Sequence, residues 1–132
     1  MKIRVVASVI ERDGQLLVCQ RPAHKRHGGL WEFPGGKVEE GESDVEAVAR
    51  ELDEELGVRV LSVGPEEFSM ADPGSHFVIV FLPVEIEGEP RCLEHAQLAW
   101  VVEEELLTLA LAPSDLQFVR FRLAAAANEP AE

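Results

Sequence analysis

Short apolar segments separated by turn residues run through much of the chain, a pattern typical of β-strands. Residues 3–9 are mostly apolar, and Asp13 and Gly14 separate them from a second apolar segment, residues 16–18. Because Asp-Gly is a preferred two-residue turn between paired strands, the chain is expected to open with a β-hairpin. Three later segments rich in valine, isoleucine and phenylalanine are expected to be strands of a mixed sheet: residues 58–63, 76–86 and 98–102.

A loop interrupts this pattern over residues 21–37. The segment contains two Gly-Gly pairs and two prolines, and the positive charge of the chain is concentrated in it. Its short apolar run, residues 30–33, is expected to form a small strand inside the loop.

The spacing of apolar residues becomes helical after this loop. Five of them recur every three or four positions, apart from one adjacent pair: Val45, Val48, Ala49, Leu52 and Leu56. Ser43 and Asp44 supply N-cap candidates and Gly57 supplies a stop signal. A helix is therefore expected between them, with its apolar face on the sheet.

Two further helices are expected near the C-terminus. Residues 103–109 are predicted to form a short one, and Ser114 and Asp115 to cap another that runs to about residue 127. The alanine-rich and acidic tail, residues 124–132, is expected to fray.

The length and composition favour one globular domain over residues 1–132. The chain is 46% hydrophobic, which is enough to bury a core, and it contains no internal repeat or linker. No run of about 18 apolar residues is present and charge interrupts the N-terminal segment early, so a soluble, cytoplasmic protein without a membrane partner is expected. Cys19 and Cys92 lie singly in apolar surroundings and are expected to be reduced core thiols.

The charge of the chain argues against some partners. With 25 acidic and 12 basic residues the net charge is −13, which disfavours binding to a long nucleic acid. A phosphorylated small molecule stays possible if divalent cations bridge it to acidic side chains. Such a bridge requires carboxylates at metal-ligand spacing in the sequence. No feature indicates an obligate protein partner.

Glu51, Glu54 and Glu55 supply such a set. Glu51 precedes Glu54 by three residues and Glu55 by four, which places all three carboxylates on one side of the predicted helix. Like charges at this spacing repel, whereas Mg²⁺ binds carboxylates together with phosphate oxygens and water. A solvated acidic face is the alternative interpretation, because charge runs are usually exposed.

The segment from Gly36 to Val58 fits a longer motif, G-x₅-E-x₇-R-E-U-x-E-E-x-G-U, in which U is a bulky apolar residue. Nine specified positions match: Gly36, Glu42, Arg50, Glu51, Leu52, Glu54, Glu55, Gly57 and Val58. With the flanking segments 20–22, 30–37 and 111–115, the chain resembles the Nudix hydrolases and, within them, the MutT-like nucleoside triphosphate pyrophosphohydrolases. The resemblance covers nearly the full length and implies an α/β fold, an α/β/α sandwich with a mixed sheet between helices.

The resemblance implies a catalytic metal site. Its ligands would be the backbone carbonyl of Gly35 and four carboxylates: Glu51, Glu54, Glu55 and Glu94. The implied cofactor is Mg²⁺, which Mn²⁺ can replace, and an activated water would attack a phosphorus atom of a diphosphate linkage. Three glutamates remain candidates for the general base: Glu51, Glu54 and Glu94.

Other residues would orient the carboxylates and the substrate. The resemblance implies that Arg50, supported by Glu42, fixes the glutamates by a bidentate ion pair, and that Arg21 and Lys37 contact phosphates. An exposed loop arginine is the alternative interpretation of Arg21. Four histidines are not needed and are expected at the surface, in loops or, for the last two, at the pocket mouth: His24, His27, His76 and His95.

The implied reaction converts a nucleoside triphosphate to a nucleoside monophosphate and pyrophosphate. One branch of such enzymes acts on oxidised guanine nucleotides such as 8-oxo-dGTP, and another on CTP, dCTP and modified pyrimidine triphosphates. Asp115 stands where guanine-specific enzymes tend to carry asparagine, which favours the pyrimidine branch. The alternatives are hydrolysis of another nucleoside diphosphate derivative and a catalytically silent binding module, although all the glutamates of the motif are present.

Three residues are expected near the base. Trp31 or Phe33 is expected to help wall the base pocket, with core packing as the alternative. Asp115 is expected to read the base from the start of the last helix, with an N-cap as the alternative. An ionised carboxylate only accepts hydrogen bonds, which suits the adjacent N–H donors of guanine, whereas cytosine presents a donor beside an acceptor and needs a protonated acid.

Overall fold

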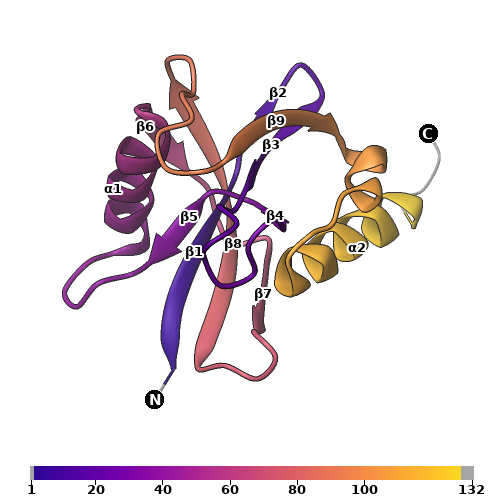
Figure 1. Cartoon of the computed structure of the whole chain (residues 1–132), viewed down its shortest axis with the longest axis horizontal. Coiled ribbons are helices and arrows are strands. Elements are labelled where there is room, and N and C mark those ends of the chain that lie inside the picture. Colours follow the sequence, from indigo (N-terminus) through magenta and orange to yellow (C-terminus); the bar gives the residue numbers. More distant parts are fainter. Residues whose placement is uncertain (1, 129–132) are drawn as a thin grey trace.

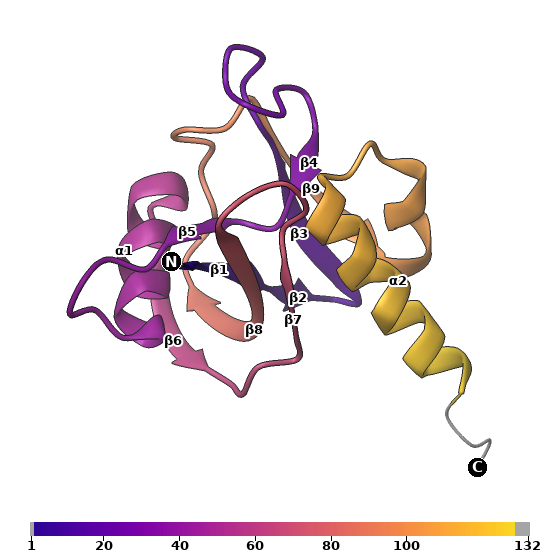
Figure 2. The same ribbon diagram turned by 90° about the horizontal axis from the view of Figure 1, so that it is seen from below.

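Two curled β-sheets occupy the centre of the molecule, and a helix covers each side (Figure 1). The computed structural model describes residues 2–128. Its strands are β1 (Ile3–Val9), β2 (Glu11–Arg12), β3 (Gln15–Gln20), β4 (Trp31–Glu32), β5 (Gly35–Lys37), β6 (Arg59–Val63), β7 (Phe68–Ala71), β8 (Phe77–Glu87) and β9 (Gln97–Val102). Its helices are α1 (Asp44–Leu56), the 3₁₀-helix η1 (Glu103–Thr108) and α2 (Pro113–Ala127). Because α1 and α2 lie on opposite sides of the sheets (Figure 2), the predicted α/β/α arrangement is confirmed.

The strands pair in a mixed pattern, as predicted. One sheet has the order β5-β1-β8-β6, with β7 also paired to β8, and the other has the order β2-β3-β4, with β9 also paired to β3. Strands β1 and β8 are parallel and the other pairs are antiparallel. The predicted strands at β4, β6, β8 and β9 are confirmed, whereas β5 and β7 were not predicted. Both are short, and β5 is a Gly-Gly-Lys segment without any apolar alternation.

The opening hairpin is smaller than predicted. Asp13 and Gly14 do form its turn, with φ of 52° and 78°, but it joins only β2 to β3. Residues 3–9 pair with β5 and β8 in the other sheet. The second half of β1 is buried at every position, so this strand lies in the interior of its sheet.

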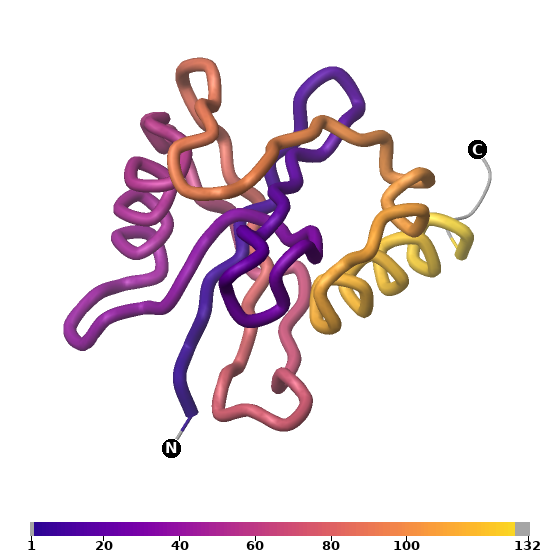
Figure 3. The backbone as a smooth tube through the Cα atoms, in the orientation of Figure 1, coloured from indigo at the N-terminus to yellow at the C-terminus, as the bar shows by residue number. Residues whose placement is uncertain are grey.

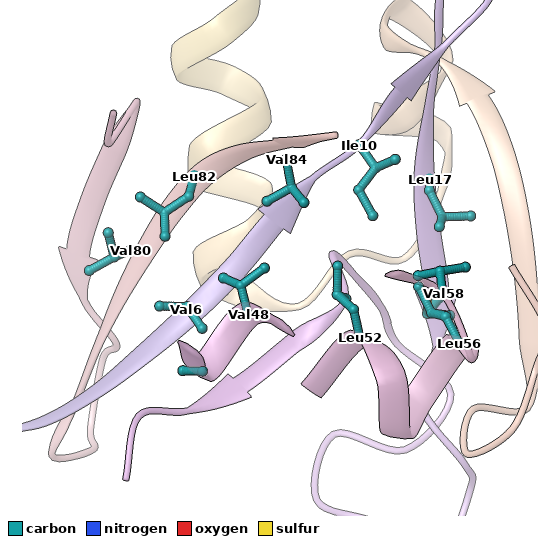
Figure 4. Close-up of a cluster of buried hydrophobic side chains, with 12 residues drawn as sticks. Val6, Ile10, Leu17, Val48, Leu52, Leu56, Val58, Val80, Leu82 and Val84 are labelled. Atoms are coloured by element: carbon teal, nitrogen blue, oxygen red, sulfur yellow. The ribbon is translucent and has the colours of Figure 1, made fainter. Parts of the chain in front are cut away.

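Helix α1 confirms the predicted caps. Ser43 accepts a hydrogen bond from the Glu46 amide, and the Glu46 side chain accepts one from the Ser43 amide; Gly57 closes the helix with φ 65°. Figure 4 shows Val48, Leu52 and Leu56 of α1 directed at strands of both sheets, and Ala47 belongs to the same buried cluster. Two residues predicted on this face are exposed instead, Val45 in the first turn and Ala49, which is turned about 100° from Val48.

Helix α2 covers an aromatic cluster on the other side of the sheets. Phe118 stacks on Phe81 at 4.3 Å between ring centroids and meets Phe33 edge-on at 5.4 Å. The helix reaches Ala127 as predicted, but Ala112 is its N-cap residue, so the predicted cap by Ser114 or Asp115 is wrong. Proline fits the first helical position because its missing N–H has no partner there.

The predicted fraying of residues 124–132 falls partly on residues 129–132, which lie outside the described residues. One domain over residues 1–132 also stays a prediction. Among the helices between residues 2 and 128, none combines the length and the apolar character needed to cross a membrane.

The connection between β8 and β9 passes over the C-terminal end of α1 (Figure 3). The amides of Arg91 and Leu93 donate to the carbonyls of Leu56 and Glu55, at 2.8 and 3.1 Å. This path leaves Cys92 exposed, so the prediction that it is a core thiol is wrong. For Cys19 the prediction is confirmed, and burial raises the pKa of its thiol.

Candidate active site

Two pockets share a wall at the end of β3 and along β4 and β5. The carboxylate pocket, about 360 Å³, is lined by Arg21, Pro22, His24, Lys25, Glu32, Gly35, Glu51, Glu55, Glu94 and His95. The apolar pocket, about 390 Å³, is lined by Val5, Val6, Ala7, Arg21, Arg26, His27, Glu32, Phe33, Gly35, Gly36, Lys37, Asp72, Phe77, Ile79, Ala112, Pro113, Ser114 and Asp115. Three residues line both: Arg21, Glu32 and Gly35. The shared residues place the two pockets next to each other.

Glu55 is the most buried carboxyl group of the carboxylate pocket, with 3% of the residue exposed. Burial raises its pKa to about 10, helped by a hydrogen bond with Glu51 and by the negative charges of Glu51 and Glu32. The backbone N–H of Gly35 opposes this shift. Among the described residues, Glu55 Oε2 has no hydrogen-bond partner although it is buried. Such an atom is costly unless another group compensates it.

Arg50 ties this helix face to the loop in front of it. Its Nε and Nη2 donate to the two oxygens of Glu42 at 2.8 and 2.9 Å, while Nη1 donates to Glu51 Oε1 at 2.8 Å. A fourth contact joins Nη2 to the carbonyl of Lys37 at 3.0 Å. The hydrogen bonds from Arg50 lower the pKa of Glu42 to about 2. The planar guanidinium therefore holds Glu51 in one orientation.

The glycines of β5 allow the helix carboxylate to approach the sheet. A Cβ atom on Gly36 would lie 2.4 Å from the carboxyl carbon of Glu51, and one on Gly35 would lie 1.9 Å from the Val6 carbonyl oxygen. No larger residue fits either position without a shift of its neighbours.

Four of the five predicted metal ligands line the carboxylate pocket: Gly35, Glu51, Glu55 and, from the exposed β8–β9 connection, Glu94. The fifth, the exposed Glu54, does not line it, and its Oε1 lies 3.8 Å from Arg50 Nη1. Over residues 2–128, no three His, Cys, Asp or Glu side chains are arranged so that they could hold an ion as they stand.

The donor set nevertheless fits a hard divalent cation. Its atoms are carboxylate and carbonyl oxygens, which Mg²⁺ prefers, and an ion beside Glu55 would compensate the unpaired oxygen. It would also offset the repulsion between Glu51 and Glu55.

Arg21 and Lys37, the predicted phosphate contacts, both reach the apolar pocket. Arg21 is not a free loop residue, because its Nη1 donates to Glu32 at 3.1 Å and its Nε donates to the Arg26 carbonyl at 2.7 Å. Lys37 Nζ lies 5.3 Å from the ring centroid of Phe77. Only Arg21 of these two lines both pockets, where an anionic ligand would cross between them.

Asp115 lines the apolar pocket. Its Oδ2 accepts a hydrogen bond from the Phe33 amide at 2.9 Å, so it joins α2 to the segment between β4 and β5. Burial raises its pKa to about 8, with further contributions from the charges of Glu32 and Asp72. The carboxyl group is thus mostly protonated near pH 7 and offers a donor as well as an acceptor.

Of the two aromatic residues predicted to wall the base pocket, one lines a pocket and the other does not. Phe33 lines the apolar pocket and also packs in the core against Phe81 and Phe118. Trp31 packs against the same core cluster and does not line either pocket.

His95 lines the carboxylate pocket with a nearly buried side chain, although no role was predicted for it. Its Nε2 lies 3.0 Å from Glu32 Oε2, and its side chain is 7% exposed. The only hint of its position in the sequence was the adjacent Glu94, a predicted metal ligand. Its partner Glu32 is 63 residues away, so no local pattern links the two.

Comparisons with known proteins agree with this arrangement. The NUDIX domain family model matches residues 1–121. The chain is 40% identical over 133 residues to the CTP pyrophosphohydrolase of Escherichia coli (strain K12), covering 98% of each, and 34% identical over 108 residues to the 8-oxo-dGTP diphosphatase of the same strain, covering 76% of this chain and 80% of the relative.

Two solved structures are also similar. The solution structure of the E. coli ORF135 protein matches with a TM-score of 0.82 at 42% identity, over 100% of this chain and 96% of the other. A MutT NUDIX hydrolase from Burkholderia pseudomallei matches with a TM-score of 0.79 at 28% identity, over 91% and 97%.

Proposed function

Since this chain belongs to the Nudix family, as a MutT-like hydrolase of phosphorus-containing anhydrides, we propose that it uses Mg²⁺ to convert a nucleoside triphosphate to a nucleoside monophosphate and pyrophosphate. The observation that carries the proposal is the position of Glu51 and the buried Glu55 in one pocket and of Asp115 in the adjoining one. The phosphate chain would lie along the carboxylate pocket, with the base in the apolar pocket.

The residues that would hold Mg²⁺ are Glu51, Glu55 and the carbonyl of Gly35, with Glu54 and Glu94 as further proposed ligands from the helix and the β8–β9 connection. When bound, Mg²⁺ or Mn²⁺ supplies a positive charge for phosphate oxygens and favours deprotonation of water. The general base stays one of Glu51, Glu54 and Glu94. Of these, Glu51 is the one held by Arg50.

The basic residues of the site would bind and orient the phosphate chain. Arg21 stands where the two pockets meet, and its guanidinium has one carboxylate partner, Glu32, so it can still donate to phosphate oxygens. Lys37 would approach the phosphates from the rim of the apolar pocket as a point charge. Together they would neutralise part of the substrate charge in a protein whose net charge is −13.

Asp115 supports a cytosine nucleotide as the substrate. A protonated carboxyl group donates through O–H and accepts through its other oxygen, which matches the N3 acceptor and the N4–H₂ donor of cytosine. The raised pKa of Asp115, about 8, keeps this form populated near neutral pH. The similarity to a protein named CTP pyrophosphohydrolase over 98% of both chains points the same way.

A second candidate is 8-oxo-dGTP, because another relative is named 8-oxo-dGTP diphosphatase. Ionised Asp115 would accept hydrogen bonds from the adjacent N1–H and N2–H₂ donors of such a base. The two candidates therefore require opposite protonation states of one side chain.

The test is a panel of nucleoside di- and triphosphates, canonical and oxidised, incubated with Mg²⁺ while pyrophosphate and phosphate are measured separately. The expected result is release of pyrophosphate, fastest from CTP or dCTP. Phosphate release from diphosphates would instead indicate another nucleoside diphosphate derivative. The absence of both metal binding and turnover would favour a non-catalytic binding module and overturn the proposal.

A further inference from the structure

His95 lies between Glu32, on the wall that the two pockets share, and Glu55, and these side chains come from distant parts of the chain. Its Nε2 lies 3.0 Å from Glu32 Oε2 and 3.7 Å from Glu55 Oε1. The other oxygen of Glu32 accepts a hydrogen bond from Arg21 Nη1 at 3.1 Å. The order of contacts is thus Arg21, Glu32, His95 and Glu55.

The backbone fixes the histidine on both sides. Two residues before it, the Leu93 amide donates to the Glu55 carbonyl at 3.1 Å, and one residue after it the Ala96 amide donates to the Gln20 carbonyl at 2.9 Å. The exposed Cys92 donates through Sγ to the carbonyl of His95 itself at 3.0 Å. The imidazole therefore has little freedom to leave the gap between the two carboxylates.

The chemistry of the neighbours determines which ring nitrogen carries the hydrogen. An ionised carboxylate only accepts, so Nε2 is the donor toward Glu32. Among the described residues, Nδ1 is buried without a hydrogen-bond partner. A histidine selected only to fill space would not require this arrangement, since an apolar ring would avoid the unpaired nitrogen.

We propose that His95 is a positioning residue that donates a hydrogen bond from Nε2 to Glu32 and separates the carboxylates of Glu32 and Glu55, so that Glu55 presents its free oxygen to a divalent cation. The inference rests on the proposed function, in which Glu55 is a metal ligand. Removal of a hydrogen-bonded neighbour of a metal ligand typically weakens metal affinity about 10- to 100-fold. His95 approaches Glu55 at 3.7 Å without a hydrogen bond, so a loss near the lower end of this range, about 10-fold, is expected when Nε2 is removed.

The test compares two replacements of His95 in the full chain. His95→Gln keeps an N–H donor near the position of Nε2, whereas His95→Phe keeps a ring of similar size without a donor. Mn²⁺ alone is titrated into each protein by calorimetry, and kcat and KM for CTP are measured at saturating Mg²⁺. His76→Phe is the matched control, because His76 is exposed and lines neither pocket.

The expected result is a dissociation constant for Mn²⁺ at least about 10-fold higher in His95→Phe, with near wild-type affinity in His95→Gln and in the control. The inference is wrong if His95→Phe binds Mn²⁺ as tightly as the wild type, or if both His95 variants lose affinity only in step with thermal stability. If His95→Phe does not fold, His95→Asn replaces it, because its shorter amide does not reach Glu32.

Failure of the proposed function would look different. A wild-type protein that binds no Mn²⁺ and hydrolyses no nucleotide would overturn both statements. A wild type that does both, with unchanged affinity in His95→Phe, would overturn the role of His95 alone.

Discussion

The carboxylate pocket and the apolar pocket each contain one buried acid, and the two acids are compensated in different ways. Burial raises the pKa of Glu55 to about 10 and that of Asp115 to about 8. Within residues 2–128, Glu55 lies among other carboxylates and has one buried oxygen without a partner, whereas Asp115 accepts a backbone hydrogen bond from Phe33. The first arrangement is incomplete without a cation, and the second is complete with a proton.

This difference shows how similar burial can serve two chemistries. In the carboxylate pocket a proton on Glu55 occupies a site that a divalent ion is expected to take, because metal ligands must be deprotonated. In the apolar pocket the proton on Asp115 is itself the useful group, because it turns an acceptor into a donor. The predictions below test each half of the comparison.

Removal of divalent cations is expected to have the largest effect. Excess chelator should abolish hydrolysis, since the divalent cation would supply positive charge beside the phosphates and favour deprotonation of the attacking water. Addition of Mg²⁺ or Mn²⁺ should restore the rate. Undiminished pyrophosphate release in excess chelator would contradict the proposal that the carboxylate pocket works only with a divalent cation.

Glu55→Gln is expected to lower kcat by about 10³-fold, which corresponds to ~4 kcal/mol of lost transition-state stabilisation. Metal-free stability should stay nearly unchanged, because Glu55 is already neutral near pH 7 and glutamine is similar in shape. Thermal melting in chelator and steady-state rates in Mg²⁺ measure the two effects.

Two other substitutions serve as references for Glu55→Gln. Glu54→Gln should also remove most activity, with unchanged or slightly raised metal-free stability, because it relieves repulsion on the helix face. Glu104→Gln, at an exposed position of η1, should change neither quantity. A large loss of metal-free stability in Glu55→Gln would show that this residue is structural.

Asp115→Asn is expected to have a smaller and substrate-dependent effect. Asparagine keeps an N–H donor beside an acceptor at any pH, so kcat/KM for CTP should persist, and its decline above about pH 8 should flatten. For a guanine nucleotide read by ionised Asp115, binding should weaken by about 1–3 kcal/mol because one donor is left unmatched. The ratio of kcat/KM for CTP, dGTP and 8-oxo-dGTP measures the effect, and a uniform change in all three would mean that Asp115 does not read the base.

The sequence predicts those parts of the molecule that depend on near neighbours. Ser43, Glu46 and Gly57 define the ends of α1 through contacts within a few residues, and the spacing of Glu51 and Glu55 follows from the helical repeat. The pairing of β1 with β5 and β8 was missed because it joins distant segments, and a strong Asp-Gly turn favours the hairpin locally.

The candidate site divides in the same way. From helical spacing alone, Glu54 and Glu55 are equally good candidates for metal ligands. The packing of α1 on the sheet buries Glu55 and leaves Glu54 exposed. His95 and its partner Glu32 are 63 residues apart, so no local pattern joins them. The N-cap prediction for Asp115 failed because α2 already begins at Pro113, and the Asp115 carboxyl group instead accepts from the Phe33 amide, 82 residues away.

The smallest expected effect concerns the stability of the protein against pH, and it isolates Asp115 from the metal site. The pKa of Asp115 is higher in the folded protein, about 8, than the ordinary value of 3.8, so the folded state holds this proton more tightly than the unfolded state. Its contribution to stability is therefore fully present below about pH 4 and is lost as pH rises through about 8.

In metal-free buffer, Asp115→Asn should remove this slope and be more stable than the wild type by on the order of 1–3 kcal/mol near pH 8, because asparagine still accepts from the Phe33 amide and carries no buried charge. Denaturant unfolding of both proteins at pH 5 and pH 8 measures the difference. Equal slopes in the two proteins would show that Asp115 is ionised in the folded state, and cytosine recognition by its protonated form would then be excluded.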